Sequence, residues 1–250
     1  MINLFKFEWR KLWQSKSLYI IFSIGFLSII ATLLVAKMVT DIFNVSANAT
    51  AYILTAIPGS SIASLLGVYA AIYACTDFSQ HTIKNVYARG YSRSAVYFTK
   101  YLVSLGVTMA VGIIYILFTF VFALMLGNYA GSIDSYMWGK LALQFWVLFG
   151  MHGLFFGISM MIGKMAGSLI VNIVGITLAF ALINTIISIF ATKFNFKFDL
   201  MNYHLEIMLK SLIDEKTLTT AELTRVIVMP IAYAVVAVTG GWLANQRRDV

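Results

Sequence analysis

The chain has 250 residues, of which 60% are hydrophobic and only 11% are charged, and its mean hydropathy is +0.86. Soluble domains carry roughly 25% charged residues, and disordered chains are richer in charge and poorer in aromatic residues. The composition therefore excludes both classes, and the single cysteine, Cys75, excludes a disulfide-stapled secreted scaffold. What remains is a polytopic membrane protein with a net charge of +8.

Six segments of the sequence are long enough to cross a bilayer, which takes about 20 apolar residues per helix. We located them as windows free of Asp, Glu, Lys and Arg, and they predict an all-α membrane protein with six transmembrane helices in one domain, residues 1–250. The polar stretch from Asn44 to Thr50 is expected to be a loop that leads into a helix near Pro58. The expected spans are residues 18–36, 55–75, 102–125, 141–162, 168–190 and 226–244.

Lysine and arginine are divided unequally between the two sides that six spans define. The side with both termini carries eleven of these cations against three acids, whereas the other side carries seven of each. The positive-inside rule therefore predicts that both termini are cytoplasmic. Because this asymmetry explains the net charge, we expect no nucleic-acid partner.

Residues 1–17 are expected to form an elbow helix that lies in the cytoplasmic interface of the membrane. Two indole rings and several cations suit that position, since indoles lie at headgroup level and charges stay in water. The alternative is a plain positively charged anchor before the first span. The apolar side of the helix would consist of Ile2, Phe5, Trp9, Leu12 and Trp13, with Glu8, Arg10 and Lys11 elsewhere.

Residues 77–99 join the second and third spans on the cytoplasmic side and are longer than a turn requires. Their first half predicts a short helix that ends at Gly90 in the left-handed conformation, and Ser92 is the expected N-cap of the next helix. Each cation of this segment would cost about 2.5–3.5 kcal/mol in lipid, so the segment stays outside the membrane core. It is either a docking element for a soluble partner or a solvated amphipathic loop.

Residues 193–225 form the largest external loop, which we expect to be ordered and pressed against membrane or protein. Its hydrophobic spacing predicts an amphipathic helix, and Thr219 with Glu222 forms a capping box for the last helix. The apolar positions of the expected helix are Met201, Leu205, Met208, Leu209 and Leu212.

Motifs of enzymes are missing from the sequence. No G-x-x-x-x-G-K-[ST] phosphate loop occurs, so we expect no ATP hydrolysis and no bound cofactor in this chain. His81, His152 and His204 lie too far apart for a zinc-binding motif, and we predict neither metal ligands nor catalytic residues. Ser159 lies two turns from His152, but it is expected to bond its own helix backbone rather than form a dyad.

The predicted spans contain no ionisable side chain other than His152, Cys75 and tyrosines, unlike those of ion-coupled carriers, which bury Asp, Glu, Lys or Arg. Energy for any transport is therefore expected from outside the membrane domain. The pairs Gly153/Gly157 and Gly163/Gly167 predict close packing of helices. Four polar residues in the spans either line a path or bond to a neighbouring helix: Gln144, His152, Asn172 and Asn184.

The stretch from Asp77 to Lys100, together with the expected topology, resembles the permease subunit of the type-2 (ABC-2) ABC exporters. The family pattern is an acidic residue, a T-x-K-N-like helix, a glycine or proline turn, an S-R pair and a lysine that starts the third span. Many members have Glu at the position of Asp77 and Gly at that of His81. The matching residues here are Asp77, Thr82 to Asn85, Gly90, Ser92, Arg93 and Lys100.

The resemblance implies a permease that forms the translocation path, pairs with a second copy or a homologous permease, and docks on separate ABC ATPase subunits that bind ATP and Mg. It implies an amphipathic peptide, antibiotic or lipid-like substrate, contact with membrane lipid, and a bacterial plasma membrane. The alternatives are a non-transporting anchor or immunity protein that binds a partner or toxin, and an intramembrane enzyme or secondary carrier. The implied ATPase-coupling interface is Gln80, His81, Thr82, Lys84, Asn85, Tyr87, Arg89 and Gly90.

Overall fold

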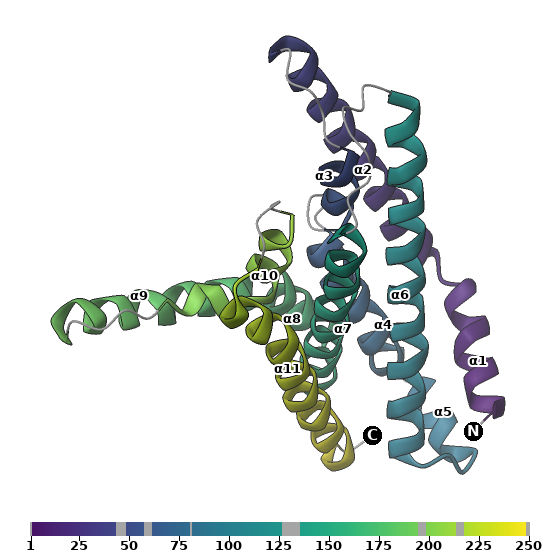
Figure 1. The fold of residues 1–250 in the computed structure, drawn as a ribbon. Helices are drawn as coiled ribbons and strands as arrows, with labels where there is room; N and C mark the ends of the chain where they lie inside the picture. Colours follow the sequence, from purple (N-terminus) through teal and green to yellow (C-terminus); the bar gives the residue numbers. More distant parts are fainter. Residues whose placement is uncertain are drawn as a thin grey trace.

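The computed structural model describes residues 2–43, 49–57, 62–80, 82–126, 136–194, 199–213 and 218–248. All regular secondary structure within these ranges is helical, as predicted (Figure 1). The elements are α1 (Ile2–Trp13), α2 (Lys16–Phe43), α3 (Ala49–Thr55), α4 (Ile62–Ser79), α5 (Thr82–Ala88), α6 (Arg93–Leu126), α7 (Tyr136–Ile162), α8 (Met165–Ile170), the π-helical turn η1 (Val171–Gly175), α9 (Ile176–Phe194), the 3₁₀ turn η2 (Leu200–Tyr203), α10 (Leu205–Ser211) and α11 (Thr220–Arg247).

Within the described residues, five helical segments are long and apolar enough to cross a membrane, and they coincide with five of the six predicted spans. The chain is therefore a multi-pass membrane protein. The helices extend past the charge-free windows because charged residues end the hydrophobic stretch without ending the helix. The five segments are Lys16–Val39, Arg93–Val121, Tyr136–Ile162, Met165–Phe190 and Thr220–Arg247.

The second predicted span, residues 55–75, falls on two shorter helices. Helix α3 ends at Thr55 and α4 begins at Ile62, and the apolar part of α4, Leu65–Ser79, is shorter than a bilayer requires. The loop expected before this span is partly helical, since α3 already begins at Ala49. That part of the prediction is wrong, and Pro58 lies outside the described residues.

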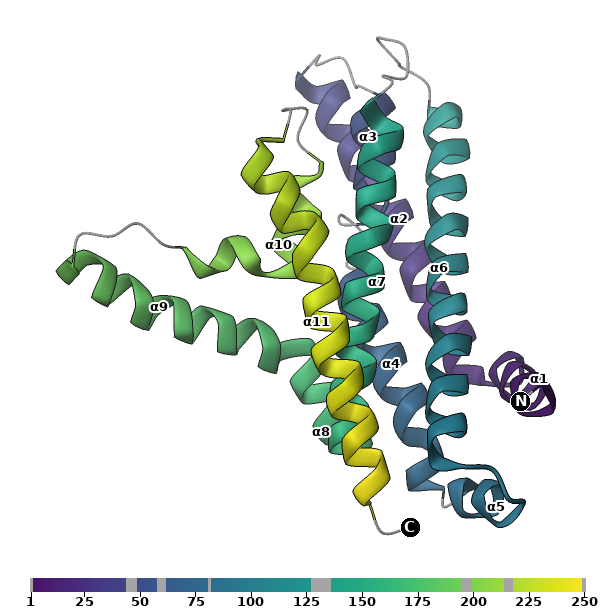
Figure 2. The same ribbon diagram turned by 60° about the horizontal axis from the view of Figure 1, so that its bottom comes forward.

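The central helix of the bundle is α7, which packs on α11 along a seam of small residues (Figure 2). A Cβ atom built on Gly153 would lie 2.7 Å from the Cβ of Ala234, and one built on Gly157 would lie 2.9 Å from the Cβ of Ala237. Real Cβ atoms do not approach so closely, so glycine is required at both positions. The predicted close packing at Gly153 and Gly157 is confirmed.

The second glycine pair does not form a packing seam, and that prediction is wrong. Gly163 lies outside the helices, in the turn between α7 and α8, with a φ angle of +67°. Only glycine adopts this conformation without strain. The guanidinium of Arg248 occupies the space beside Gly163, so the position joins the turn to the C-terminal end of α11.

Helix α9 leaves the bundle, whereas α8 before it packs beside α4 and α7 (Figures 1 and 2). The π-helical turn η1 lies between the two helices. In the span Met165–Phe190, none of the most apolar window is buried within the protein. In a membrane the surface of this window therefore contacts lipid or another protein. The exposed apolar residues of α9 include Leu178, Leu182, Ile183, Ile186, Ile189 and Phe190.

The described part of the segment between α9 and α11 packs on protein, which is one of the two arrangements expected for it. In α10 and just after it, Leu205, Met208, Leu209 and Leu212 are buried in the main hydrophobic core. The capping box before α11 is confirmed, because the backbone N–H of Thr219 donates to Glu222 Oε2 at 2.8 Å and the N–H of Glu222 donates to Thr219 Oγ1 at 3.4 Å.

Candidate functional site

Helix α5 and its flanking turns have the local structure that the sequence predicts. Gly90 follows α5 with a φ angle of +86°, and its N–H donates to the carbonyl oxygen of Tyr87 at 2.9 Å. The N–H of Ala95 donates to Ser92 Oγ at 3.2 Å, so Ser92 caps the next helix, α6. The left-handed glycine and the serine N-cap thus turn the chain back into the bundle within a few residues.

The short helix exposes a basic, polar face. Ile83 is buried against the bundle, whereas Lys84, Asn85 and Arg89 are exposed. Of the other residues in the predicted coupling interface, Gln80 and Gly90 are exposed, Thr82 and Tyr87 are half-buried, and His81 lies outside the described residues. Apart from His81, the structure therefore brings all of these residues to one short segment at the end of the bundle where both termini of the chain lie (Figure 1).

Four residues with ionisable side chains, from three helices, meet next to α5, and we call Glu8, Lys11, Asp77 and Lys100 the charge cluster. Lys100 of α6 is only 1% exposed and pairs with Asp77 at the end of α4. Lys100 Nζ also lies 3.3 Å from the carboxylate of Glu8 in α1, which is fully buried. Lys11 of α1 forms a second ion pair with Asp77. The cluster joins α1, α4 and α6.

Neutral groups complete the cluster and connect it to α5. The hydroxyl of Tyr73 donates to Glu8 Oε2 at 2.9 Å, and the hydroxyl of Thr82, the first residue of α5, donates to Asp77 Oδ1 at 2.9 Å. The ammonium of Lys100 lies 5.0 Å from the centre of the Tyr73 ring, where the π-face attracts a cation. Buried charges are stable only when they are paired and hydrogen-bonded. These contacts provide partners for Lys100, Asp77 and Glu8 Oε2, whereas Glu8 Oε1 has no hydrogen bond and lies 3.3 Å from Lys100 Nζ.

The burial of Glu8 was not predicted, because an acid on an amphipathic helix is ordinarily exposed to water. A signal was present in the sequence, since Leu4, Glu8 and Leu12 share one face at spacings of four residues. All three are buried. Leu12 therefore faces the bundle, and its predicted place on the same side as the aromatic residues is wrong.

The aromatic residues of α1 form a separate exposed ridge. The rings of Phe5 and Trp9 stack at 6.3 Å between centroids, and Trp9 meets Trp13 edge-on at 6.0 Å. All three side chains are at least 40% exposed. The helix thus has a bundle-facing side with a buried charge and an outer side of amphipathic rings.

Two arginines clamp the ends of three helices next to α5. The guanidinium of Arg93, at the start of α6, donates to the carbonyl oxygens of Gln246 and Arg248, both at 2.7 Å. Arg248 in turn donates to the carbonyl oxygens of Met160 and Met161 at the end of α7, at 3.1 and 2.9 Å. Carbonyls at helix C-termini lack intrahelical partners and attract cations, so these contacts fasten α6, α7 and α11 together.

The polar residues predicted in the spans bond to neighbouring backbone or side chains. Gln144 donates to the carbonyl oxygen of Leu54 in α3 at 2.8 Å. Asn184 accepts a hydrogen bond from the N–H of Leu200 at 2.7 Å, and Asn172 donates to the carbonyl oxygen of Gly67 at 3.2 Å. These contacts favour helix packing over a shared transport path, because they do not bring the residues to one site.

His152 and Ser159 do not form a dyad. The two nitrogens of the buried His152 ring lie 3.0 Å from the hydroxyl oxygens of Ser104 and Thr108 in α6. Ser159 donates to the carbonyl oxygen of Phe155 at 2.7 Å, as expected for a serine that bonds its own helix. Within the described residues, no group of three or more His, Cys, Asp or Glu is arranged to hold a metal ion.

Comparison with known families agrees with this architecture. Residues 4–178 match the family described as ABC-2 family transporter protein. The match runs from α1 through the charge cluster and α5 to the beginning of α9. No curated protein is similar enough to the chain to count as a match. The chain therefore belongs to the ABC-2 family of transporter membrane proteins.

Proposed function

We propose that the protein is the permease subunit of an ATP-driven exporter and that α5 is the surface on which separate ATPase subunits dock. Family membership supports a membrane component that generally does not hydrolyse ATP itself. The sequence has no phosphate loop, so ATP and Mg would be held by the partner. The observation that carries the docking assignment is the exposure of Lys84 and Asn85 on α5 and of Arg89 in the turn after it, next to a buried charge cluster.

The proposed topology has six crossings with both termini and α5 in the cytoplasm. In this topology α3 and α4 together make the second crossing, although neither is long enough alone. The position of both chain ends and α5 at one end of the bundle supports it (Figure 1). Helix α1 would lie in the interface as the elbow, with Phe5, Trp9 and Trp13 at headgroup level.

The charge cluster and the backbone contacts of Arg93 and Arg248, which we call the arginine clamp, suggest how movement of α5 would reach the bundle. Closure of the ATPase subunits would displace α5, and the hydrogen bond from Thr82 to Asp77 would transmit that displacement to the cluster. From there the ion pairs lead to α1 and α6, while Arg93 leads to α11. The elements around α5 would therefore move as one body.

The substrate proposed for the exporter is an amphipathic peptide, antibiotic or lipid-like molecule, and a second permease, either a copy or a homologue, would complete the path. The alternative function is a non-transporting anchor or immunity protein. The two proposals differ in their requirement for nucleotide, because an anchor would act without an ATPase subunit.

Two exposed cations are available for charge reversal, one in α5 and one in the turn after it. Reversing both charges with Lys84→Glu and Arg89→Glu should lower ATP-dependent transport by about tenfold or more, since removing one partner of a buried charge pair at an interface costs about 2–5 kcal/mol. The measurement is transport by the complex in proteoliposomes, alongside the ATPase activity that copurifies with the permease in mild detergent. We expect ATP hydrolysis to continue but to lose its stimulation by substrate.

A matched control makes the same charge change at the same end of the molecule. Lys164→Glu with Arg247→Glu alters two exposed cations outside α5 and should leave transport unchanged. Equal loss of transport in the two double variants would assign the effect to net charge. Normal transport by the Lys84 and Arg89 variant would reject α5 as the docking surface.

A further inference from the structure

Helix α1 lies at the edge of the bundle and crosses its long helices. Figure 2 shows α1 nearly end-on, whereas α6, α7 and α11 are seen along their lengths. The hydroxyl of Tyr19, in the first turn of α2, donates to the carbonyl oxygen of Trp13 at 2.9 Å and so ties the start of α2 to the end of α1. Because the long helices span the bilayer in the proposed topology, α1 runs along the membrane surface.

Three rows of side chains follow α1, each with a spacing of four residues. The first row packs on the bundle and includes the buried Leu4 and Leu12. The second row is the exposed ridge of aromatic rings. The third row consists of Lys6 and Arg10, each of which follows a ring of the ridge by one residue. Since an α-helix turns by about 100° per residue, these cations lie beside the ridge on its side away from the bundle.

The exposed charges of α1 and of its junction with α2 are all positive. Lys6, Arg10 and Lys16 are exposed, and none of them has an ion pair or a hydrogen bond with another described residue. The one acid of α1, Glu8, is fully buried in the charge cluster. Folding therefore separates the charges of this helix, because its acid is used inside the bundle and its free cations remain outside.

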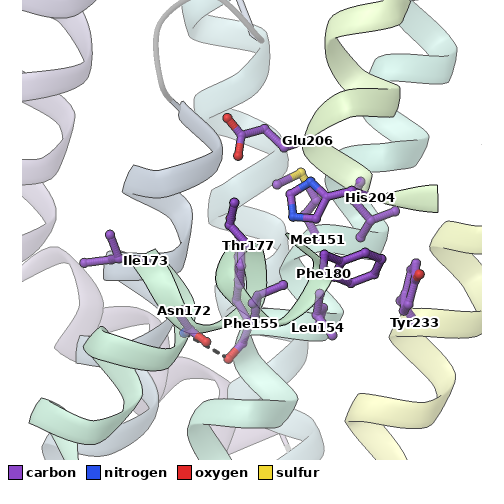
Figure 3. A pocket seen from close by; sticks show the side chains of 12 residues that line it. Met151, Leu154, Phe155, Asn172, Ile173, Thr177, Phe180, His204, Glu206 and Tyr233 are labelled. Atoms are coloured by element: carbon purple, nitrogen blue, oxygen red, sulfur yellow. Dashed lines mark hydrogen bonds between the residues drawn. The ribbon is translucent and has the colours of Figure 1, made fainter. Parts of the chain in front are cut away.

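Polar groups on the opposite side of the bundle are bonded within the protein. Figure 3 shows the small pocket between α7, η1, α9 and α11, with Asn172 at one end and Glu206 at the other. Asn172 donates to the carbonyl oxygen of Phe155 at 3.3 Å, and Glu206 pairs with Lys210 at 2.9 Å. The carboxylate of this pocket is thus already neutralised, unlike the three exposed cations at α1.

We propose that the aromatic ridge together with Lys6, Arg10 and Lys16 binds the headgroups of anionic phospholipids, and that this contact sets the position of α5. Each cation near an anionic membrane surface raises the affinity about fivefold, and indole rings favour the headgroup level. The bundle-facing side of α1 belongs to the charge cluster, which accepts a hydrogen bond from Thr82 of α5. The lipid surface goes beyond the exporter function, whereas its effect on α5 rests on that function.

The test measures which phospholipids are retained by the purified protein with the subunits that copurify with it. Native mass spectrometry in an uncharged detergent compares phosphatidylglycerol, which is anionic, with phosphatidylcholine, which has no net charge, both with the same acyl chains. We expect phosphatidylglycerol to bind the wild type at least tenfold more tightly. Raising the ammonium acetate concentration to about 1 M should reduce this preference, because a Debye length of about 3 Å screens exposed charges.

Three double variants test the location. Lys6→Gln with Arg10→Gln removes two exposed charges and keeps the rings and the charge cluster, so the preference should fall about tenfold or more. Lys6→Arg with Arg10→Lys keeps both charges and should keep the preference. Lys164→Gln with Arg247→Gln is the matched control, because it removes two exposed cations outside α1 at the same end of the molecule. We expect it to leave the preference unchanged.

The effect on α5 has a separate measurement, which is ATP-dependent transport in proteoliposomes. Replacing part of the phosphatidylcholine by phosphatidylglycerol should raise transport severalfold for the wild type but not for Lys6→Gln with Arg10→Gln. Thr82→Val keeps the shape of the side chain and removes the hydrogen bond to Asp77. This variant should lose the response of transport to phosphatidylglycerol while it retains the lipid as the wild type does.

Several outcomes would contradict the proposal. Equal retention of the two lipids by the wild type, or a preference that survives Lys6→Gln with Arg10→Gln, would overturn the lipid surface. An equal loss of preference in the Lys164 and Arg247 variant would assign the effect to net charge and overturn it as well. Transport that does not respond to phosphatidylglycerol would overturn the link to α5. Lipid retention needs no nucleotide, so its failure would leave the exporter proposal standing, and retention by a permease without any ATPase would support the lipid surface alone.

Discussion

Glu8 is a buried carboxylate whose partners are distant in the sequence. Tyr73 and Lys100 lie 65 and 92 residues away from it, so no local pattern could pair them. The ion pairs form only after α1 has folded against α4 and α6. At the residue scale, the charge cluster is therefore a product of tertiary structure, whereas the exposed residues of α5 follow from helical periodicity alone.

Removal of one cation should unbalance this cluster. Lys100→Met leaves Glu8 and Asp77 with Lys11 as their remaining cation in the cluster, and breaking a buried ion pair in this way costs about 3–5 kcal/mol. We expect the temperature of unfolding to fall accordingly. The single cysteine, Cys75, is fully buried, so its reaction with a thiol-specific dye on heating measures the unfolding.

The double variant Lys100→Met with Asp77→Asn restores equal numbers of acids and bases in the cluster. Its unfolding temperature should recover part of the loss, giving a clear departure from additivity. Lys84→Met is the control for the substitution itself, because Lys84 is exposed and such changes are usually within about 0.5 kcal/mol. Strictly additive losses would show that the four charges act independently.

At the scale of the elements, the seam between α7 and α11 depends on the absence of side chains. Gly153 and Gly157 of α7 face Ala234 and Ala237 of α11 closely enough to leave no room for a Cβ atom. Gly139 lies in the same helix α7 with no heavy atom within 4 Å of a built Cβ atom. The two kinds of glycine therefore respond differently to the same substitution.

Gly157→Ala should destabilise the protein by about 1–3 kcal/mol, because the added methyl group overpacks the seam. Gly139→Ala should leave stability unchanged or raise it by up to about 1 kcal/mol, since alanine is the better helix former. The dye reaction of Cys75 on heating measures both effects. Equal responses would mean that α7 and α11 are less closely packed than the seam requires.

For the whole molecule, the charge-free windows predicted five of the helices that can cross a membrane. They succeeded because bilayer thickness fixes the length of an apolar helix. The windows could not reveal that α3 ends at Thr55 and α4 begins at Ile62, since both helices are apolar. The course of α9 away from the bundle was not predictable either, because it depends on contacts around η1 rather than on hydrophobicity.

The candidate site was predicted to a similar extent. Gly90 and Ser92 have strong local preferences, so the turn after α5 and the cap of α6 could be read from the sequence. Asp77 and Lys100 were recognised as parts of a pattern without any indication that they form an ion pair. The arginine clamp was not predictable, because Arg93 and Arg248 bind backbone carbonyls that no sequence motif marks.

The proposed topology predicts which side of the membrane each loop faces. In a Cys75→Ser background, Lys84→Cys should not react with an impermeant maleimide in intact cells and should react in inside-out vesicles. Arg225→Cys, in the first turns of α11, should show the opposite pattern. Labelling of Lys84→Cys from outside intact cells would reverse the orientation and remove α5 from the reach of a cytoplasmic ATPase.

The glycine seam also constrains how the protein is made. Residues 163–219 separate the two helices that it joins, and ribosomes add roughly 5–20 residues per second. Helix α7 is therefore in the membrane for several seconds before α11 is synthesised, and during that time Gly153 and Gly157 lack the helix that packs on them.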